Sequence, residues 1–401
     1  MYKIIENGTV TSVKGILAAG IHAGIKKYKK DLALVYSKTE CNVAGTFTIN
    51  KVKAAPLLVS QEIVNKHSKV RAVLVNSGNA NACTGEKGFE NALLMQGLCA
   101  DSLSLKPNEV LVSSTGVIGQ QLPMEQFHTG IPAVVAALTE TGGNDAAEAI
   151  MTTDKKSKQI AVEVTTSKGV FTIGGIGKGS GMIAPNMATM LVFITTDAAV
   201  DTELLQMVLK QSVKRSYNRI SVDGETSTND MVTVMANGES GVEISMHDDT
   251  LLAFSEALDV VNVFLAKEIV ADGEGATKLI TIAINGAKSV EDADLIGRSV
   301  SNSSLVKTAI YGEDANWGRI VSAVGQSGAD VVPEKISVFF DELPILKENY
   351  DIVLDEEAAA KVLAEKEFTI TINLGVGDVD VTWWTCDFTE EYIKINASYR
   401  S

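Results

Sequence analysis

The chain has 401 residues, of which 45% are hydrophobic and 21% charged, and this composition predicts a globular protein rather than a disordered one. Its 50 acidic and 35 basic residues give a net charge of −15, which disfavours nucleic acid and anionic membranes as partners. The apolar stretch at 15–25 is too short to span a bilayer, and no basic region of a signal peptide precedes it. We therefore expect a cytoplasmic protein.

The hydrophobic pattern predicts a mixture of strands and helices without the regular alternation of a doubly wound sheet. The cationic run Lys26–Lys30 is interpreted as a solvated bend without a function. Runs rich in β-formers predict strands at 32–36, 70–75, 109–113, 160–165, 170–173 and 190–195. Helical spacing of apolar residues predicts helices at 86–103, 126–139, 202–217 and 248–270. The length favours two lobes, and the glycine-rich stretch Gly174–Gly181 is the expected flexible seam.

The cysteines and histidines show no metal-binding spacing. The four cysteines form no CxxC pair and the four histidines form no HExxH motif, so no metal site is predicted. We expect the cysteines to be reduced, mostly as small buried residues, in a reducing compartment.

The glycine-rich stretch matches two nucleotide-binding patterns only in part. Gly179 follows Lys178 where a Walker A motif needs Ser or Thr. Residues 179–184 match GxGxxA, but only five residues, one of them a proline, separate Ala184 from the next predicted strand. No helix that could hold a pyrophosphate fits there. The sequence has no GxSxG elbow, and no Ser-His-Asp site can be singled out from the four dispersed histidines. For nucleophilic catalysis this leaves a hydroxyl activated without histidine, such as a threonine activated by its own N-terminal amine.

The segment KGSGMIAPNMATML at 178–191 resembles the processing site of the ornithine acetyltransferase family, also called glutamate N-acetyltransferases. Five further segments resemble family motifs in the same order: NSGNANACTG at 76–85, STGVIG at 114–119, DGETSTND at 223–230, GEDANWGR at 312–319 and NASYRS at 396–401. The resemblance covers essentially the whole chain. Ser398 and Ala315 depart from the acidic residue and the proline that are common in the family, and neither is a proposed catalytic group.

The resemblance implies an α/β (α+β) fold of two lobes, with stacked β-sheets flanked by helices, that cleaves itself between Ala188 and Thr189. The products are an α chain of residues 1–188, which contains the oxyanion-hole segment, and a β chain of residues 189–401, which begins with the nucleophile. The family also implies an α2β2 heterotetramer. The small side chain of Ala188 leaves the scissile carbonyl accessible to the hydroxyl of Thr189.

The resemblance further implies that Thr189 accepts the acetyl group of N-acetylornithine and passes it to glutamate in a ping-pong cycle of arginine biosynthesis. Its free α-amine, with an ordinary pKa of about 7.7 to 8.0, is suited to act as the base. The family pattern places the oxyanion hole at the Thr115 side chain and the Gly116 N–H. The implied substrate contacts are Thr152, Lys178, Thr189, Glu274, Asn396 and Ser401.

Two alternatives to this function remain open. A self-processing aminopeptidase or amidase of related architecture would use water as the acceptor, and a non-enzymatic relative would only bind an amino acid. No cofactor is expected, and the sequence leaves open whether acetyl-CoA also serves as an acetyl donor.

Overall fold

The computed structural model describes residues 1–184 and 190–398. These residues form two compact units. Among them, unit 1 comprises residues 1–179, 190–216 and 226–269, and unit 2 comprises residues 180–184, 217–225 and 270–398. The chain passes from the first unit to the second between Gly179 and Ser180. Neither unit coincides with the predicted products 1–188 and 189–401, and that cut stays a prediction because compactness does not test where a chain is cleaved.

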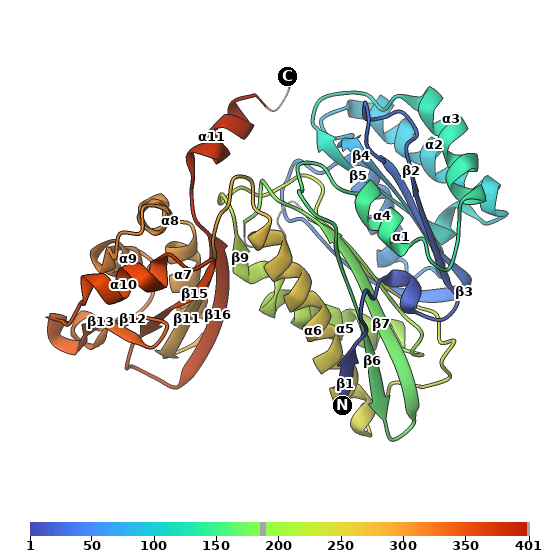
Figure 1. Ribbon diagram of the computed structural model, residues 1–401. Helices are drawn as coiled ribbons and strands as arrows, with labels where there is room; N and C mark the ends of the chain where they lie inside the picture. Colours follow the sequence, from blue (N-terminus) through green and yellow to red (C-terminus); the bar gives the residue numbers. More distant parts are fainter. Residues whose placement is uncertain (185–189, 399–401) are drawn as a thin grey trace. The chain divides into compact units, whose positions relative to one another are not determined.

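Unit 1 is built on a mixed sheet that has nine strands among the described residues. The strands are β1 (Tyr2–Ile4), β2 (Ile16–Ile21), β3 (Leu32–Phe47), β4 (Val70–Asn79), β5 (Val110–Val117), β6 (Lys158–Thr166), β7 (Gly169–Lys178), β8 (Leu191–Thr196) and β10 (Met231–Ala236). Their order is β1-β6-β7-β8-β10-β3-β4-β5, with β2 also paired to β3. Figure 1 shows β6 and β7 as two long neighbouring strands in green. The helices are α1 (Ala55–Asn65), α2 (Gly85–Leu103), α3 (Met124–Ala136), α4 (Gly143–Ala149), α5 (Thr202–Arg215) and most of α6 (Asp249–Ala271).

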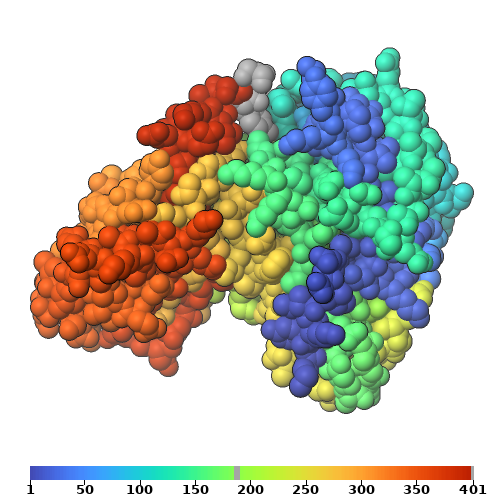
Figure 2. Space-filling model, in the orientation of Figure 1, coloured from blue at the N-terminus to red at the C-terminus, as the bar shows by residue number. Residues whose placement is uncertain are grey.

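Both faces of the central strands of this sheet are buried. In β3, Leu32 and Leu34 pack with α2 and α3, whereas Ala33 and Val35 pack into a second cluster that includes α4. Two-sided burial explains why β3 begins as a continuous apolar run instead of an alternating one. At the edge, β1 pairs with β6 and its three residues are exposed, and Figure 2 shows the N-terminal residues in dark blue on the surface.

Unit 2 contains a second mixed sheet, with seven strands in the described part of the chain. Its strands are β9 (Ile220–Ser221), β11 (Leu279–Ala287), β12 (Ser337–Phe340), β13 (Leu343–Lys347), β14 (Asp351–Ile352), β15 (Glu367–Asn373) and β16 (Val379–Cys386). The order is β14-β13-β12-β15-β11-β16-β9. The helices are α7 (Val290–Ser301), α8 (Ser304–Tyr311), α9 (Trp317–Gly325), α10 (Glu356–Leu363) and α11 (Glu390–Ala397).

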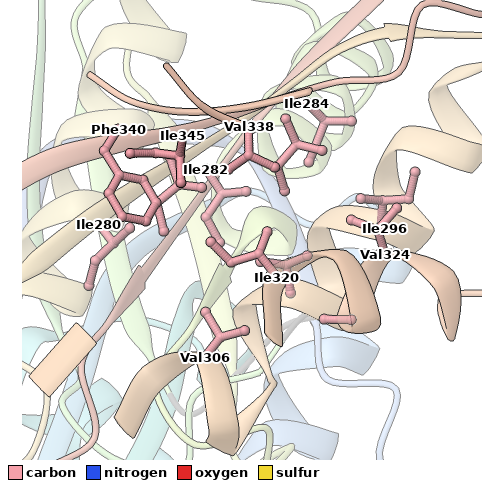
Figure 3. Packing of buried hydrophobic residues seen from close by; sticks show 14 of the residues in the cluster. Ile280, Ile282, Ile284, Ile296, Val306, Ile320, Val324, Val338, Phe340 and Ile345 are labelled. Atoms are coloured by element: carbon pink, nitrogen blue, oxygen red, sulfur yellow. The ribbon is translucent and has the colours of Figure 1, made fainter. Parts of the chain in front are cut away.

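The core of unit 2 lies between its sheet and the helices α7, α8 and α9. Ile280, Ile282 and Ile284 project from β11 toward Ile296 of α7 and Ile320 of α9 (Figure 3). The alternate spacing of these isoleucines puts all three on one face of the strand. Across residues 1–184 and 190–398, no helix is long and apolar enough to cross a membrane.

The predicted mixed α/β class is confirmed, and each predicted strand and helix is found with shifted ends. The predicted strand at 70–75 continues to Asn79, and the predicted helix at 126–139 ends at Ala136. These ends shift because hydrogen bonding and packing, rather than the apolar pattern, decide where an element stops.

The prediction that Gly174–Gly181 forms a flexible seam is wrong for its first part. Residues 174–178 belong to β7, where 174–177 pair with both β6 and β8 and Lys178 pairs with β8. A Cβ atom at Gly174 would lie 2.3 Å from the carbonyl oxygen of Thr9, and one at Gly175 would crowd Leu265 of α6. Close packing against this strand, not backbone freedom, therefore accounts for the glycines.

Gly297 of α7 offers a test of the packing in unit 2. A Cβ atom there would lie 2.3 Å from Cδ1 of the buried Trp383. We predict that Gly297→Ala lowers the free energy of unfolding of unit 2 by about 1–3 kcal/mol through overpacking. All three tryptophans of the chain lie in unit 2, so urea unfolding followed by tryptophan fluorescence measures this unit.

Gly325→Ala is the matched control, because a Cβ atom at the end of α9 meets nothing within 4 Å. This variant should unfold at the same urea concentration as the wild type or slightly higher. Equal losses of stability in the two variants would contradict the packing explanation.

Candidate active site

Thr115 and Gly116 lie near the end of β5, where this strand pairs in parallel with β4. Gly78 stands opposite Gly116, and Thr115 is buried. Gly116 has a φ of 131°, and a Cβ atom on it would lie 2.4 Å from the carbonyl carbon of Gly78. Only glycine fits this close approach of two backbones, which fixes the position of the segment.

Buried polar side chains hold the ends of β4 and β5 together. Ser114 Oγ donates to Asn76 Oδ1 at 2.6 Å, and Asn76 Nδ2 donates to the Asn79 carbonyl at 2.9 Å. The Nδ2 group of Asn229 donates to the carbonyls of both Ala80 and Ser114, each at 2.7 Å. Because satisfied buried networks are rigid, the segment that carries Thr115 is held in place.

Asp230, the next residue after Asn229, holds the backbone on the C-terminal side of the predicted nucleophile. Its Oδ1 accepts the Met190 N–H at 2.9 Å, and Met231 stands opposite Leu191 in the parallel pair β8 and β10. Asp230 is completely buried, and burial raises the pKa of its carboxyl well above the ordinary value, against the opposing effect of the Met190 N–H. Two consecutive residues therefore hold two strands: Asn229 bonds the strand that carries Thr115, and Asp230 bonds the backbone just after position 189. We call this pair of contacts the brace.

Thr189 and Ala188, the predicted nucleophile and cleavage-site residues, lie outside the described residues, as does the predicted substrate contact Ser401. The structure describes the strand β7 before the predicted cleavage site and the strand β8 after it. These two strands pair antiparallel, with Lys178 opposite Leu191.

Asp154 connects two of the predicted substrate contacts, Thr152 and Lys178. Its Oδ2 accepts the Thr152 N–H at 2.9 Å, and its Oδ1 accepts the Gly179 N–H at 2.8 Å and the Lys158 ammonium at 2.7 Å. Burial would raise the pKa of Asp154, but the charges of Lys178 and Lys158 outweigh it and hold this pKa well below its ordinary value. The buried carboxylate is therefore ionised at neutral pH.

Lys178 ends β7 with only 2% of its surface exposed. Its charge lowers the pKa of both Asp154 and Asp230, which places its ammonium within electrostatic reach of both carboxyls. The buried ammonium of Lys178 is therefore compensated by the ionised carboxylate of Asp154.

The end of α4, three residues before Thr152, contacts the strand next to Thr115. Ser77 Oγ of β4 donates to the carbonyl of Ala149, the last residue of α4, at 2.5 Å. Ser77 stands opposite Thr115 in the paired strands, and Asp154 accepts the Thr152 N–H within electrostatic reach of Lys178. The candidates Thr115, Gly116, Thr152 and Lys178 therefore all lie in unit 1, and their roles stay predictions.

Glu274 and Asn396, the remaining described candidates, come together in unit 2. Asn396 Nδ2 donates to Glu274 Oε2 at 2.8 Å, and the Glu274 N–H donates to the Ser180 carbonyl at 2.7 Å. A Cβ atom on Gly181 would lie 2.4 Å from the Glu274 carboxyl carbon. Glycine at 181 therefore lets the carboxyl of Glu274 approach the backbone.

Asp223 of unit 2 was not identified as a site residue from the sequence. Its carboxylate accepts the N–H groups of Met182 at 2.6 Å and Ile183 at 2.9 Å. Burial raises the pKa of Asp223, and the charge of Glu274 adds to this effect. This residue therefore holds the backbone on the N-terminal side of the predicted cleavage site.

Sequence reasoning also missed Asn229, Asp230 and Asp154. The first two, like Asp223, belong to the segment 223–230, which the resemblance singled out without assigning a role. Asp154 had no comparable signal, because an Asp four residues before a Lys is usually part of an exposed ion pair. The other unassigned segment, 312–319, joins two helices: Asn316 caps α9 by accepting the Arg319 N–H.

A sequence model of the ArgJ family matches residues 17–401. Two relatives, each named arginine biosynthesis bifunctional protein ArgJ, align along nearly the whole chain. The protein from Symbiobacterium thermophilum is 48% identical and covers 98% of this chain and 99% of its own. The protein from Chlorobaculum tepidum is 50% identical, with 97% and 96% covered. A structure of ornithine acetyltransferase from Mycobacterium tuberculosis, complexed with ornithine, is 39% identical, covers 46% of this chain and 98% of its own, and has a TM-score of 0.43.

Replacement of Asp154 tests whether its charge holds this part of the site. We predict that Asp154→Asn lowers the free energy of unfolding of unit 1 by about 3–5 kcal/mol at neutral pH, because it leaves buried lysine charges uncompensated. Since the folded pKa of Asp154 is depressed, the stabilisation is present at neutral pH and is lost as the pH falls toward that value. Urea unfolding followed by circular dichroism measures the loss.

Asp259→Asn is the matched control in the same unit, because Asp259 pairs with Arg215 on the surface, where their side chains are 30% and 46% exposed. An exposed pair of this kind contributes at most about 1 kcal/mol. If both variants lose the same stability, Asp154 does not have the proposed role.

Proposed function

The chain belongs to the ArgJ family, and from this membership we propose how its residues divide the chemistry of acetyl transfer. The protein is a glutamate N-acetyltransferase of arginine biosynthesis. An acetyl group leaves the α-nitrogen of N2-acetylornithine and is passed to the α-amine of glutamate.

Thr189 is the proposed nucleophile of a ping-pong reaction. Its hydroxyl oxygen attacks the acetyl carbonyl, the bond from that carbon to the ornithine nitrogen breaks, and the leaving amine takes up a proton. The α-amine of glutamate then attacks the acetyl-threonine ester and releases the threonine hydroxyl. The observation that carries this assignment is the brace formed by Asn229 and Asp230, which ties the Thr115 segment and the strand after position 189 to two consecutive residues.

The nucleophile must first be released from its own chain. In the proposed step the Thr189 hydroxyl attacks the carbonyl of Ala188, and hydrolysis of the resulting ester yields chains of residues 1–188 and 189–401. The new α-amine has an ordinary pKa of about 7.7 to 8.0, so a useful fraction is neutral and can take the hydroxyl proton. The two products are proposed to assemble as an α2β2 heterotetramer.

The proposed oxyanion hole is formed by the Thr115 hydroxyl and the Gly116 N–H. Two features support this role: Thr115 is buried, and the close contact of Gly116 with Gly78 fixes the backbone before any substrate arrives. Donors that are already in place stabilise a developing oxyanion without reorganisation.

The proposed substrate contacts follow the charges of the amino acids. Lys178 and Thr152 suit the α-carboxylate, because Asp154 holds both near each other in unit 1. Glu274 suits the side-chain ammonium of ornithine, and Asn396, which donates to this carboxylate, orients it. Ser401 is retained as a proposed contact on the resemblance alone.

No bound cofactor is proposed, because a threonine ester can carry the acetyl group between the two substrates. The relatives are named bifunctional, and this supports acetyl-CoA as a second acetyl donor. A cytoplasmic location is proposed, since all four cysteines are free thiols, which fits a reducing compartment.

Intact mass spectrometry tests the nucleophile. We predict two chains in the wild type and, after incubation with N-acetylornithine, an added acetyl mass on the chain that begins at Thr189. Thr189→Ala should stay a single unacetylated chain because both steps need the hydroxyl, whereas Thr189→Ser should retain some of each. A cleaved or acetylated Thr189→Ala chain contradicts the assignment, and release of ornithine at the same rate without glutamate favours the aminopeptidase or amidase alternative.

Thr115→Ala tests the oxyanion hole. Loss of one donor should lower kcat by about 10²- to 10³-fold while KM stays near the wild-type value, since the donor acts on the transition state. Thr195→Val is the control, because Thr195 is equally buried in the same sheet and donates its hydroxyl to the Val10 carbonyl at 2.9 Å. A near-normal kcat for Thr115→Ala would exclude this residue.

A further inference from the structure

The cationic run that begins at Lys26 is not uniformly solvated. Lys29 is exposed, as predicted. Lys30 is half-buried and pairs with Asp145 and Glu148, at 2.5 and 2.8 Å. Lys26 is also half-buried but turns to a different part of unit 1. The prediction of a solvated bend is therefore wrong for the two ends of the run.

The backbone of Lys26 is held by a buried carboxylate. Asp31, with no exposed surface, accepts the N–H groups of Ala23 at 2.6 Å, Gly24 at 3.2 Å and Lys26 at 2.8 Å. The Asp31 carbonyl in turn accepts the Ser77 N–H at 2.9 Å. The loop is therefore built around one side chain and attached to β4, which leaves little freedom at Lys26.

The side chain of Lys26 runs from one predicted site segment to another. A Cβ atom on Gly78 would lie only 2.8 Å from Cγ of Lys26. Gly78 stands opposite Gly116 in the paired strands. The Lys26 ammonium donates to the carbonyl of Met151 at 2.9 Å, directly before Thr152. The stem therefore lies beside the proposed oxyanion segment, and the charge lies at the proposed substrate loop.

The charges around Lys26 favour an additional anion. The pKa of Lys26 is lowered to about 8, chiefly by burial, with Lys29 and Lys178 adding to the shift and Asp31 and Asp154 opposing it. Asp31 is already occupied by three backbone donors, and Asp154 by Lys158 and two backbone donors. Two lysine ammonium groups thus lie within electrostatic reach of each other, an arrangement that a bound carboxylate would stabilise.

We propose that the Lys26 ammonium binds a carboxylate of the amino-acid substrates, beside the oxyanion segment and the Thr152 loop. The inference rests on the proposed function. An ammonium has three donors, and within the described part of the chain Lys26 uses one, on Met151, which leaves two for a ligand. N-acetylornithine offers an α-carboxylate, and glutamate offers an α- and a γ-carboxylate.

The test compares each substrate with an analogue that lacks one carboxylate. KM is measured for N-acetylornithine and its methyl ester, and for glutamate and glutamine, with the wild type and Lys26→Met. We expect Lys26→Met to raise KM for a carboxylate substrate roughly 10- to 100-fold, as the loss of a charge-assisted hydrogen bond does, with kcat within about threefold. The KM of the matching analogue should hardly change.

The substrate and analogue whose KM values become similar in Lys26→Met show which carboxylate Lys26 binds. Similar values for N-acetylornithine and its ester assign Lys26 to the α-carboxylate, and similar values for glutamate and glutamine assign it to the γ-carboxylate. For each substrate, the informative quantity is the ratio of the analogue's KM to the substrate's KM. If Lys26→Met keeps both ratios at wild-type values, the proposal is overturned. A merely structural role would raise KM for substrate and analogue alike, and that result overturns it too.

Two further variants complete the experiment. Lys30→Met removes a neighbouring half-buried lysine that is already paired and should keep both ratios. Lys26→Arg keeps a cation and should restore part of the discrimination. Since the Lys26 ammonium loses its proton as the pH rises through about 8, the wild-type KM for the affected substrate should rise there, and less so in Lys26→Arg.

Mass spectrometry of the wild type separates this inference from the proposed function. If N-acetylornithine leaves no acetyl group on the chain that begins at Thr189, the proposed function fails. If that chain is acetylated normally but the ratios of Lys26→Met are unchanged, only the role of Lys26 fails.

Discussion

A charged carboxylate in the interior of unit 1 sets the arrangement of the residues around it. Asp154 is ionised although it is buried, and an isolated charge there would be very costly. The Lys158 ammonium and the N–H groups of Thr152 and Gly179 must therefore all point at it in the folded chain. This requirement couples the loop after α4 to the end of β7, and so brings Thr152 and Lys178 together without any direct contact between them being needed.

The second constraint is the pair Asn229 and Asp230. One side chain satisfies two carbonyls near the oxyanion segment, and the next satisfies the amide after position 189. Because the two residues are joined by a peptide bond, a displacement of one strand end would be passed to the other. A reaction in which a hydroxyl and two oxyanion donors must meet the same carbonyl depends on this kind of fixed spacing.

The sequence predicted the strands and helices well because two-sided burial leaves unbroken apolar runs, as in β3. The resemblance singled out Thr115, Gly116, Thr152 and Lys178, all of which lie in unit 1, and their roles stay predictions. The sequence could not predict Asp154 or Lys26, since the burial of a charge depends on residues far away in the chain, such as Lys178 for Asp154 and Gly78 for Lys26. The prediction of a flexible seam at the glycines of β7 was wrong for the same reason. A glycine needed for close packing and a glycine needed for flexibility look alike in a sequence.

The strand order of unit 1 has a consequence for a chain cut at the proposed position. Strands β8 and β10 would belong to the second fragment, yet they lie between β7 and β3, which both belong to the first. The fragments would be interleaved within one sheet, so that their separation requires two ladders of hydrogen bonds to break at once. Unfolding would then release two molecules from one, and renaturation would become a second-order process whose yield depends on concentration.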